Sequence, residues 1–132
     1  MINHIGRILV GAVFTYMGIY KILNWGATAG WMEMKGLPFI PVLLFIAILV
    51  EMGGGLLLIL NKQTKFVSIG LAIFLIPTNI IFHNFWALPP ELAASEFLSF
   101  LQNIAIIGGL LVIAFKQSEL AVNQSYEKSA KY

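Results

Sequence analysis

The sequence predicts an all-α integral membrane protein built as a four-helix bundle. Apolar residues make up 59% of the 132 residues and charged residues only 11%, whereas soluble domains carry about 25% charged residues. The apolar residues fall into four runs of about 20, the length that a helix needs to cross about 30 Å of hydrocarbon. Because these runs use most of the chain, we expect a single transmembrane domain over residues 1–132.

Breaks between the apolar runs set the expected helix limits. Glycines and Pro38 interrupt the chain after the first run, where Ala27–Met34 has the composition of a short interfacial helix. Residues 87–96 contain Pro89 and are expected to form a loop, with Ser95-Glu96 as the start of the last helix. We therefore expect helices at about residues 4–23, 39–60, 66–86 and 97–115, followed by a polar tail at residues 116–132.

The third apolar run contains a proline. Pro77 removes an amide donor and frees the carbonyl of Ile73, so a kink is expected at this point. Thr78 and Asn79 are close enough to donate a hydrogen bond to the freed carbonyl. Beyond the kink, Asn79 and His83 recur at helical spacing and define one polar face.

The basic residues predict the orientation. Four spans place the N-terminus, the turn at residues 61–65 and the tail on one side, which then carries six lysines and arginines against two on the other. The positive-inside rule puts the richer side, and hence both termini, in the cytoplasm. We expect an integral protein of the bacterial cytoplasmic (inner) membrane. The six residues are Arg7, Lys62, Lys65, Lys116, Lys128 and Lys131, and the two are Lys21 and Lys35.

Composition limits the possible chemistry. The chain has no cysteine, which excludes disulfides, cysteine-ligated iron–sulfur clusters and thiolate zinc sites. His4 and His83 are expected at opposite ends of the bundle, on the order of 25 Å apart, so neither a haem nor a histidine metal site is expected. The net charge of +2 comes from scattered residues and does not indicate nucleic-acid binding.

Polar side chains from all four helices are predicted to converge in the outer half of the membrane. Bundle cores commonly hold ligand sites built from facing helices, and small-molecule sites are mostly apolar with a few polar groups. Tyr16 equally fits the aromatic belt at the membrane surface. The candidate ligand-binding residues are Tyr16, Lys21, Glu51, Asn79, His83, Gln102 and Asn103.

Each candidate also has a structural interpretation. Glu51 in mid-span can pair with Lys21 or hydrogen-bond between helices, although ionisable residues inside membranes are functional hypotheses by default. His83 can be a packing residue, or it can exchange protons near neutral pH. Gln102 and Asn103 can serve as hydrogen-bonding contacts between helices, and the glycines of the apolar runs are expected to allow close packing.

Four short motifs resemble the DoxX family of small four-helix membrane proteins. They are Gly18-Ile-Tyr-Lys21, Glu51 with the glycines and leucines that follow it, Phe82-His83, and Gln102-Asn103-Ile-Ala-Ile-Ile-Gly-Gly-Leu-Leu. The similarity extends from about Arg7 to Phe115. Family members include a subunit of a thiosulfate:quinone oxidoreductase, and the resemblance implies that Lys21, Glu51, His83 and Asn103 line a site for a quinone or another lipid-soluble ligand. Gln102 departs from the family, which often has a lysine there.

Three functions follow as hypotheses. The first is a quinone-interacting subunit of a membrane oxidoreductase, which works with another subunit or a soluble redox partner. The second is a non-catalytic membrane scaffold that recruits a soluble partner. The third is a small-solute or lipid permease that acts as a homo-oligomer. Four helices with one buried carboxylate provide few of the features that alternating-access transporters use.

Overall fold

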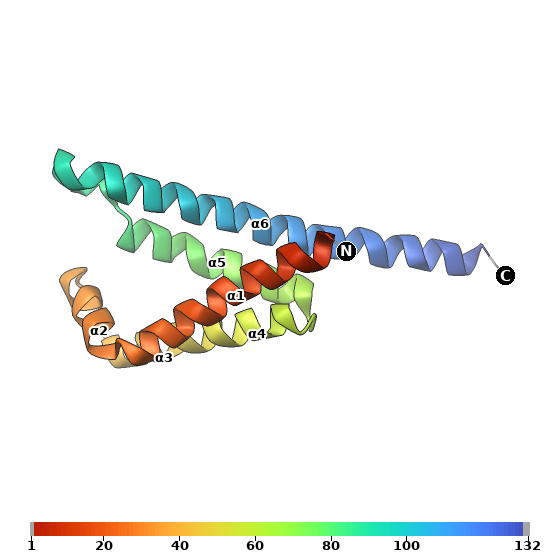
Figure 1. Cartoon of the computed structure of the whole chain (residues 1–132), viewed down its shortest axis with the longest axis horizontal. Helices are drawn as coiled ribbons and strands as arrows, with labels where there is room; N and C mark the ends of the chain where they lie inside the picture. Colours follow the sequence, from red (N-terminus) through yellow and green to blue (C-terminus); the bar gives the residue numbers. More distant parts are fainter. Residues whose placement is uncertain (1, 131–132) are drawn as a thin grey trace.

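The computed structural model describes residues 2–130, and all regular structure in this range is helical (Figure 1). Four stretches are long and apolar enough to cross a membrane: His4–Leu23, Ile40–Ile59, Thr64–Ala87 and Pro90–Lys116. The predicted all-α fold with four spans is therefore confirmed. The elements are α1 (Ile2–Leu23), α2 (Trp25–Met34), α3 (Ile40–Ile48), the π-helix η1 (Leu49–Gly53), α4 (Gly54–Ile59), α5 (Thr64–Phe82), the 3₁₀-helix η2 (Phe85–Ala87) and α6 (Pro90–Ser129).

The second span is not a uniform α-helix. It consists of α3, η1 and α4 in direct succession, and η1 contains Glu51. Single π turns inside α-helices are rare and are often found at functional sites. The run of glycines that begins at Gly53 lowers the helix propensity at this point, which favours such a local deformation.

Glycines let α1 and the second span approach closely. A Cβ atom added to Gly11 would lie 2.7 Å from the carbonyl oxygen of Gly55, and one added to Gly18 would lie 2.6 Å from Cβ of Met52. These contacts confirm the predicted packing role for both residues of α1. Gly108 and Gly109 have no atom within 4 Å of such a Cβ, so the expectation that they pack closely within the chain is wrong.

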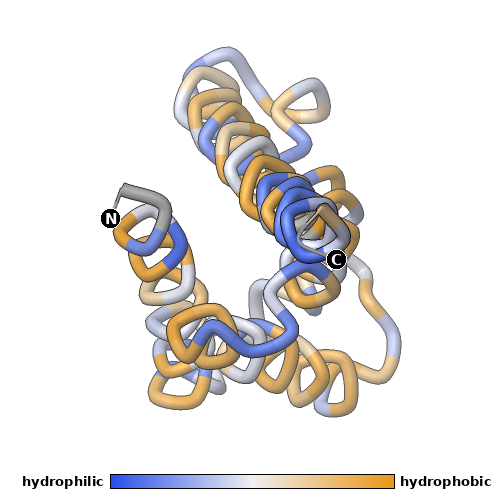
Figure 2. Tube along the Cα trace, turned by 90° about the vertical axis from the view of Figure 1, so that its right-hand side faces the viewer, coloured by the Kyte–Doolittle hydropathy of each residue, from blue (hydrophilic) through white to orange (hydrophobic). Residues whose placement is uncertain are grey.

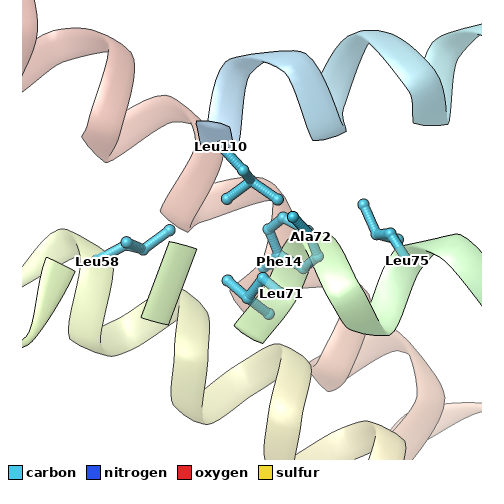
Figure 3. Close-up of a cluster of buried hydrophobic side chains, with 6 residues drawn as sticks. All are labelled: Phe14, Leu58, Leu71, Ala72, Leu75 and Leu110. Carbon is cyan, nitrogen blue, oxygen red and sulfur yellow. The ribbon is translucent and has the colours of Figure 1, made fainter. Parts of the chain in front are cut away.

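Two apolar clusters hold the helices together. The larger joins α1, α4, α5 and α6, and Figure 3 shows Phe14 beside Leu71 and Ala72 of α5 and Leu110 of α6. The smaller cluster packs Met32 of α2 against Leu44 and Ile48 of α3, which fixes the short helix predicted between the first two spans. The larger cluster consists of Phe14, Leu58, Leu71, Ala72, Leu75 and Leu110.

The third span passes through its proline without a break. Helix α5 contains Pro77 and ends at Phe82. The hydroxyl of Thr78 donates to the carbonyl of Phe74 at 2.8 Å. This acceptor is one residue beyond Ile73, whose carbonyl is the one that Pro77 leaves without an amide donor. The kink at Pro77 stays a prediction, as does the side of the membrane on which the termini lie.

Helix α6 is longer at both ends than expected. It begins at Pro90, not at Ser95-Glu96, and continues to Ser129 instead of ending near residue 115. Proline is favoured in the first helical turn because its φ angle is already helical. Beyond Gly109 no glycine or proline interrupts the chain, so the polar tail continues the helix past the membrane span, as Figure 1 shows.

The bundle is open on one side. Helix α1 packs mainly against α4, α5 packs mainly against α6, and contacts between α1 and α6 are few. In Figure 2, viewed from the other direction, the start of α1 stands apart from α6. In the most apolar 18-residue stretch of the fourth span, only 11% of the residues are buried within the protein. Most of the membrane-spanning part of α6 is therefore accessible to lipid.

Candidate functional site

An ion pair joins the first two spans near one end of the bundle. Nζ of Lys21, in the last turn of α1, lies 2.6 Å from Oε2 of Glu51. Only 1% of the Glu51 side chain is exposed, compared with 21% for Lys21. The pairing that the sequence allowed is thus present, and it provides the cation that a carboxylate within a membrane span requires.

Two asparagines link the third and fourth spans. Nδ2 of Asn79 donates to the backbone carbonyl of Phe100 at 3.2 Å, and Nδ2 of Asn103 donates to Oδ1 of Asn79 at 3.0 Å. Asn79 is only 1% exposed, and both hydrogen-bonding functions of its amide are used. The pair holds the amide of Asn103 in a fixed position on α6.

His83 at the end of α5 also bonds to α6. Its Nδ1 lies 2.8 Å from Oε2 of Glu96, and the ring of Trp31 stands edge-on to it with centroids 6.1 Å apart. The sequence predicted neither partner, because it indicates a helix start at Glu96 and a short interfacial helix around Trp31, and neither pattern places these residues beside His83. No local pattern places α2 over the end of α5, so only the tertiary structure identifies these contacts.

A cavity of about 270 Å³ lies among these groups. Apolar residues of α1, α2, α3 and α5 make up most of its walls, and Leu43 and Ile46 of α3 are themselves exposed on the outside of the bundle. The cavity therefore borders the region where lipid chains lie. The polar and charged residues in its walls are Lys21, Thr28, Glu51, Thr78, His83 and Asn103.

The predicted site residues divide into three groups. Four of them line the cavity, namely Lys21, Glu51, His83 and Asn103. Asn79 is buried behind the wall and bonds to Asn103. Tyr16 and Gln102 lie outside the cavity.

These last two residues, Tyr16 and Gln102, lie on exposed faces of their helices. The Tyr16 side chain is 66% exposed and pairs with the ring of Tyr20 on the outside of α1. Five residues of α-helix separate it from Lys21, a rotation of about 140° around the axis. Gln102 is also exposed, because it lies about 100° around the helix from its neighbour Asn103. Tyr16 therefore fits the belt interpretation given above.

The two histidines have separate surroundings. His83 borders this cavity, and His4 lies at the other end of α1 beside a different groove. The two residues therefore line different hollows.

Two family profiles and two bacterial proteins are similar in sequence to this chain. The DoxX family profile matches residues 2–84, and the profile of the SURF4 family matches residues 56–129. Inner membrane protein YqjF of Escherichia coli is 32% identical over 110 residues, and inner membrane protein YphA of the same organism is 24% identical over 110 residues. Each alignment covers 83% of this chain and 79% of the relative.

No solved structure matches the chain. The names of both relatives, together with the four spans, confirm the predicted location in the bacterial inner membrane. The matched region contains three of the four motifs noted in the sequence, including Lys21, Glu51 and His83. This chain therefore belongs to the DoxX family.

Proposed function

We propose that the cavity beside Lys21 and Glu51 binds the ring of a quinone, and that the protein is a quinone-interacting subunit of a membrane oxidoreductase. The observation that carries this proposal is the ion pair in the wall of a mostly apolar cavity. A carboxylate that is 1% exposed inside a membrane span is costly. A ligand-binding role explains the presence of this carboxylate better than helix packing alone.

The residues present fit a quinone. A volume of about 270 Å³ is close to the lower limit of about 300 Å³ for ligand pockets, which suits a ring better than a whole isoprenoid lipid. The tail would leave past Leu43 and Ile46, where the cavity borders the lipid. A bound quinone would supply the redox chemistry by accepting two electrons, from a partner subunit or soluble dehydrogenase, and two protons.

The roles of the side chains follow from their hydrogen bonds. The Lys21 ammonium uses one N–H for Glu51 and has two more to donate to a carbonyl oxygen. Asn103 is oriented by Asn79 and has a second amide N–H to donate. Nδ1 of His83 engages Glu96, so Nε2 is the atom that would give a proton to the quinone as it is reduced, and Glu96 would relay a replacement proton from the membrane surface to His83.

Quinone binding can be measured through the intrinsic fluorescence of Trp31. This residue lines the cavity, so a bound decyl-quinone should quench its emission, and Trp31→Phe identifies its share of the signal. Glu51→Gln and His83→Ala should each weaken binding, whereas Tyr16→Phe on the outer surface should leave it unchanged. Unchanged binding in both cavity variants, with helical content preserved, would remove the proposal.

A scaffold role is the second candidate, and the long α6 favours it. About three turns of this helix lie beyond the span that ends at Lys116, and they expose Leu120, Val122 and Tyr126. A soluble partner could pack against such a helix. Deleting residues 120–132 should then abolish co-purification of a stoichiometric protein partner, while quinone quenching of Trp31 stays the same.

A further inference from the structure

A second, larger hollow lies at the opposite end of the bundle from the quinone candidate site. It is a groove of about 460 Å³ between the start of α1 and α6, with Asn61 of the α4–α5 turn at its base. It occupies the open side of the bundle seen in Figure 2. His4 is the first residue of the first span and Lys116 is the last of the fourth. The groove therefore opens at the membrane boundary.

One end of this groove is cationic. His4, Arg7 and Lys116 line it, and none of the three forms an ion pair with a described residue. Arg7 is only 7% exposed. A charged side chain with so little access to water needs a compensating charge or hydrogen-bond acceptors.

Arg7 is only partly satisfied by the protein. Its Nη1 donates to the backbone carbonyls of Leu58 and Ile59 at the end of α4, where the helix dipole is negative. Among the residues whose side chains the structure describes, Nη2 and Nε of Arg7 have no hydrogen-bond partner. The guanidinium therefore retains donors in the fixed geometry that suits a phosphate group.

The rest of the groove is apolar. Val10, Val112 and Ile113 lie deeper in the membrane along the facing sides of α1 and α6, and Gly109 leaves space between them. A ligand with an anionic head at the boundary and a hydrocarbon chain below it would match this arrangement. Basic pockets between transmembrane helices at the cytoplasmic surface are known to hold the head groups of anionic lipids.

We propose that this groove is a binding site for one anionic phospholipid of the leaflet that faces the N-terminus. The phosphate accepts hydrogen bonds from Arg7, with Lys116 and His4 beside it. One acyl chain fills the space between α1 and α6. The lipid would complete the open side of the bundle.

Native mass spectrometry of the purified protein tests this proposal. Phosphatidylglycerol and phosphatidylcholine with identical acyl chains are added at equal concentration, and the lipid-bound fraction of each is counted. Lys116→Gln should weaken phosphatidylglycerol retention about fivefold, the effect of one basic residue at a membrane surface. Lys128→Gln, which removes the same charge from the same helix beyond the groove, should have no effect. Ile113→Trp should weaken retention of both lipids by filling the groove.

Several results would overturn the proposal. Equal retention of the two lipids would show that the charge at the boundary does not select the head group. An equal loss in Lys116→Gln and Lys128→Gln would indicate a general surface effect. Complete displacement of the lipid by inorganic phosphate would indicate a simple anion site. A dimer that forms as lipid is removed would assign the groove to a second copy of the chain. Circular dichroism of each variant verifies that its helices are intact.

Discussion

Replacing Lys21 with methionine should destabilise the bundle more than replacing its partner Glu51 with glutamine. The two side chains form one ion pair at 2.6 Å, but their surroundings differ, because Glu51 is 1% exposed and Lys21 is 21% exposed. Lys21→Met leaves a buried carboxylate without its cation. Glu51→Gln leaves an ammonium in the last turn of α1, whose long side chain can extend to water at the membrane surface.

The structure gives approximate sizes for the two effects. Removing one partner of a buried ion pair lowers the free energy of unfolding by about 3 to 5 kcal/mol. We expect the lower value, about 3 kcal/mol, for Lys21→Met because polar groups in the cavity can partly solvate the Glu51 carboxylate. Glutamine keeps a hydrogen bond to Lys21, so Glu51→Gln should cost about 1 kcal/mol, the usual size of a polar contact between membrane helices. The double variant removes both charges and should lose less than the sum of the two single losses.

Reversible unfolding in mixed micelles, followed by the far-ultraviolet circular dichroism of the helices, measures these free energies. Tyr20→Phe, a change on the exposed surface of α1 next to Lys21, serves as the control and should leave the free energy of unfolding unchanged. Equal losses in the two single variants would refute the argument from burial. A double variant whose loss equals the sum would show that the pair contributes no coupling energy.

Three further predictions concern packing. Gly11→Leu should lower the free energy of unfolding by about 1 to 3 kcal/mol, because a Cβ there would meet the carbonyl of Gly55 at 2.7 Å. Gly108→Leu places its side chain in open space and should leave the free energy of unfolding unchanged in the same measurement. Asn79→Leu should cost about 1 to 2 kcal/mol by removing the bonds to Phe100 and Asn103, and a loss below the error of the measurement would contradict the geometry. Deleting residues 122–132 should leave the unfolding free energy of the spans unchanged, since that part of α6 is exposed.

The spans could be predicted from the sequence because membrane insertion depends on local hydropathy. Each run of about 20 apolar residues satisfies its own backbone hydrogen bonds as a helix, whatever its neighbours are. The true end of α6 could not be predicted this way. Hydropathy falls at Lys116 while the helix continues to Ser129, because leaving the membrane does not by itself end a helix.

The candidate site could be predicted only in part, because local sequence patterns do not show how the helices are rotated and packed against one another. Glu51 stands out as a charge within an apolar run, and Lys21, near the outer end of the first span, is the cation that the sequence offers as its partner. Asn103 and Gln102 are adjacent in sequence and look equivalent, yet only the rotation of α6 decides which one faces the cavity. Glu96 and Trp31 reach the site from a helix start and a short interfacial helix, whose positions over the end of α5 no local pattern predicts.

The position of the core bears on the hypothesis of transport. Leu75 belongs to the larger apolar cluster and also lines the cavity beside Glu51, while Val10 packs against the same cluster and lines the groove at the other end. The fully buried side chains of Phe14, Leu58 and Leu110 therefore lie between the two hollows. A polar solute could not pass from one to the other within a single chain without disrupting this layer, because its charges would lose their hydration among packed apolar groups. The arrangement of one hollow at each end, with packed apolar side chains between them, favours binding over transport by the monomer.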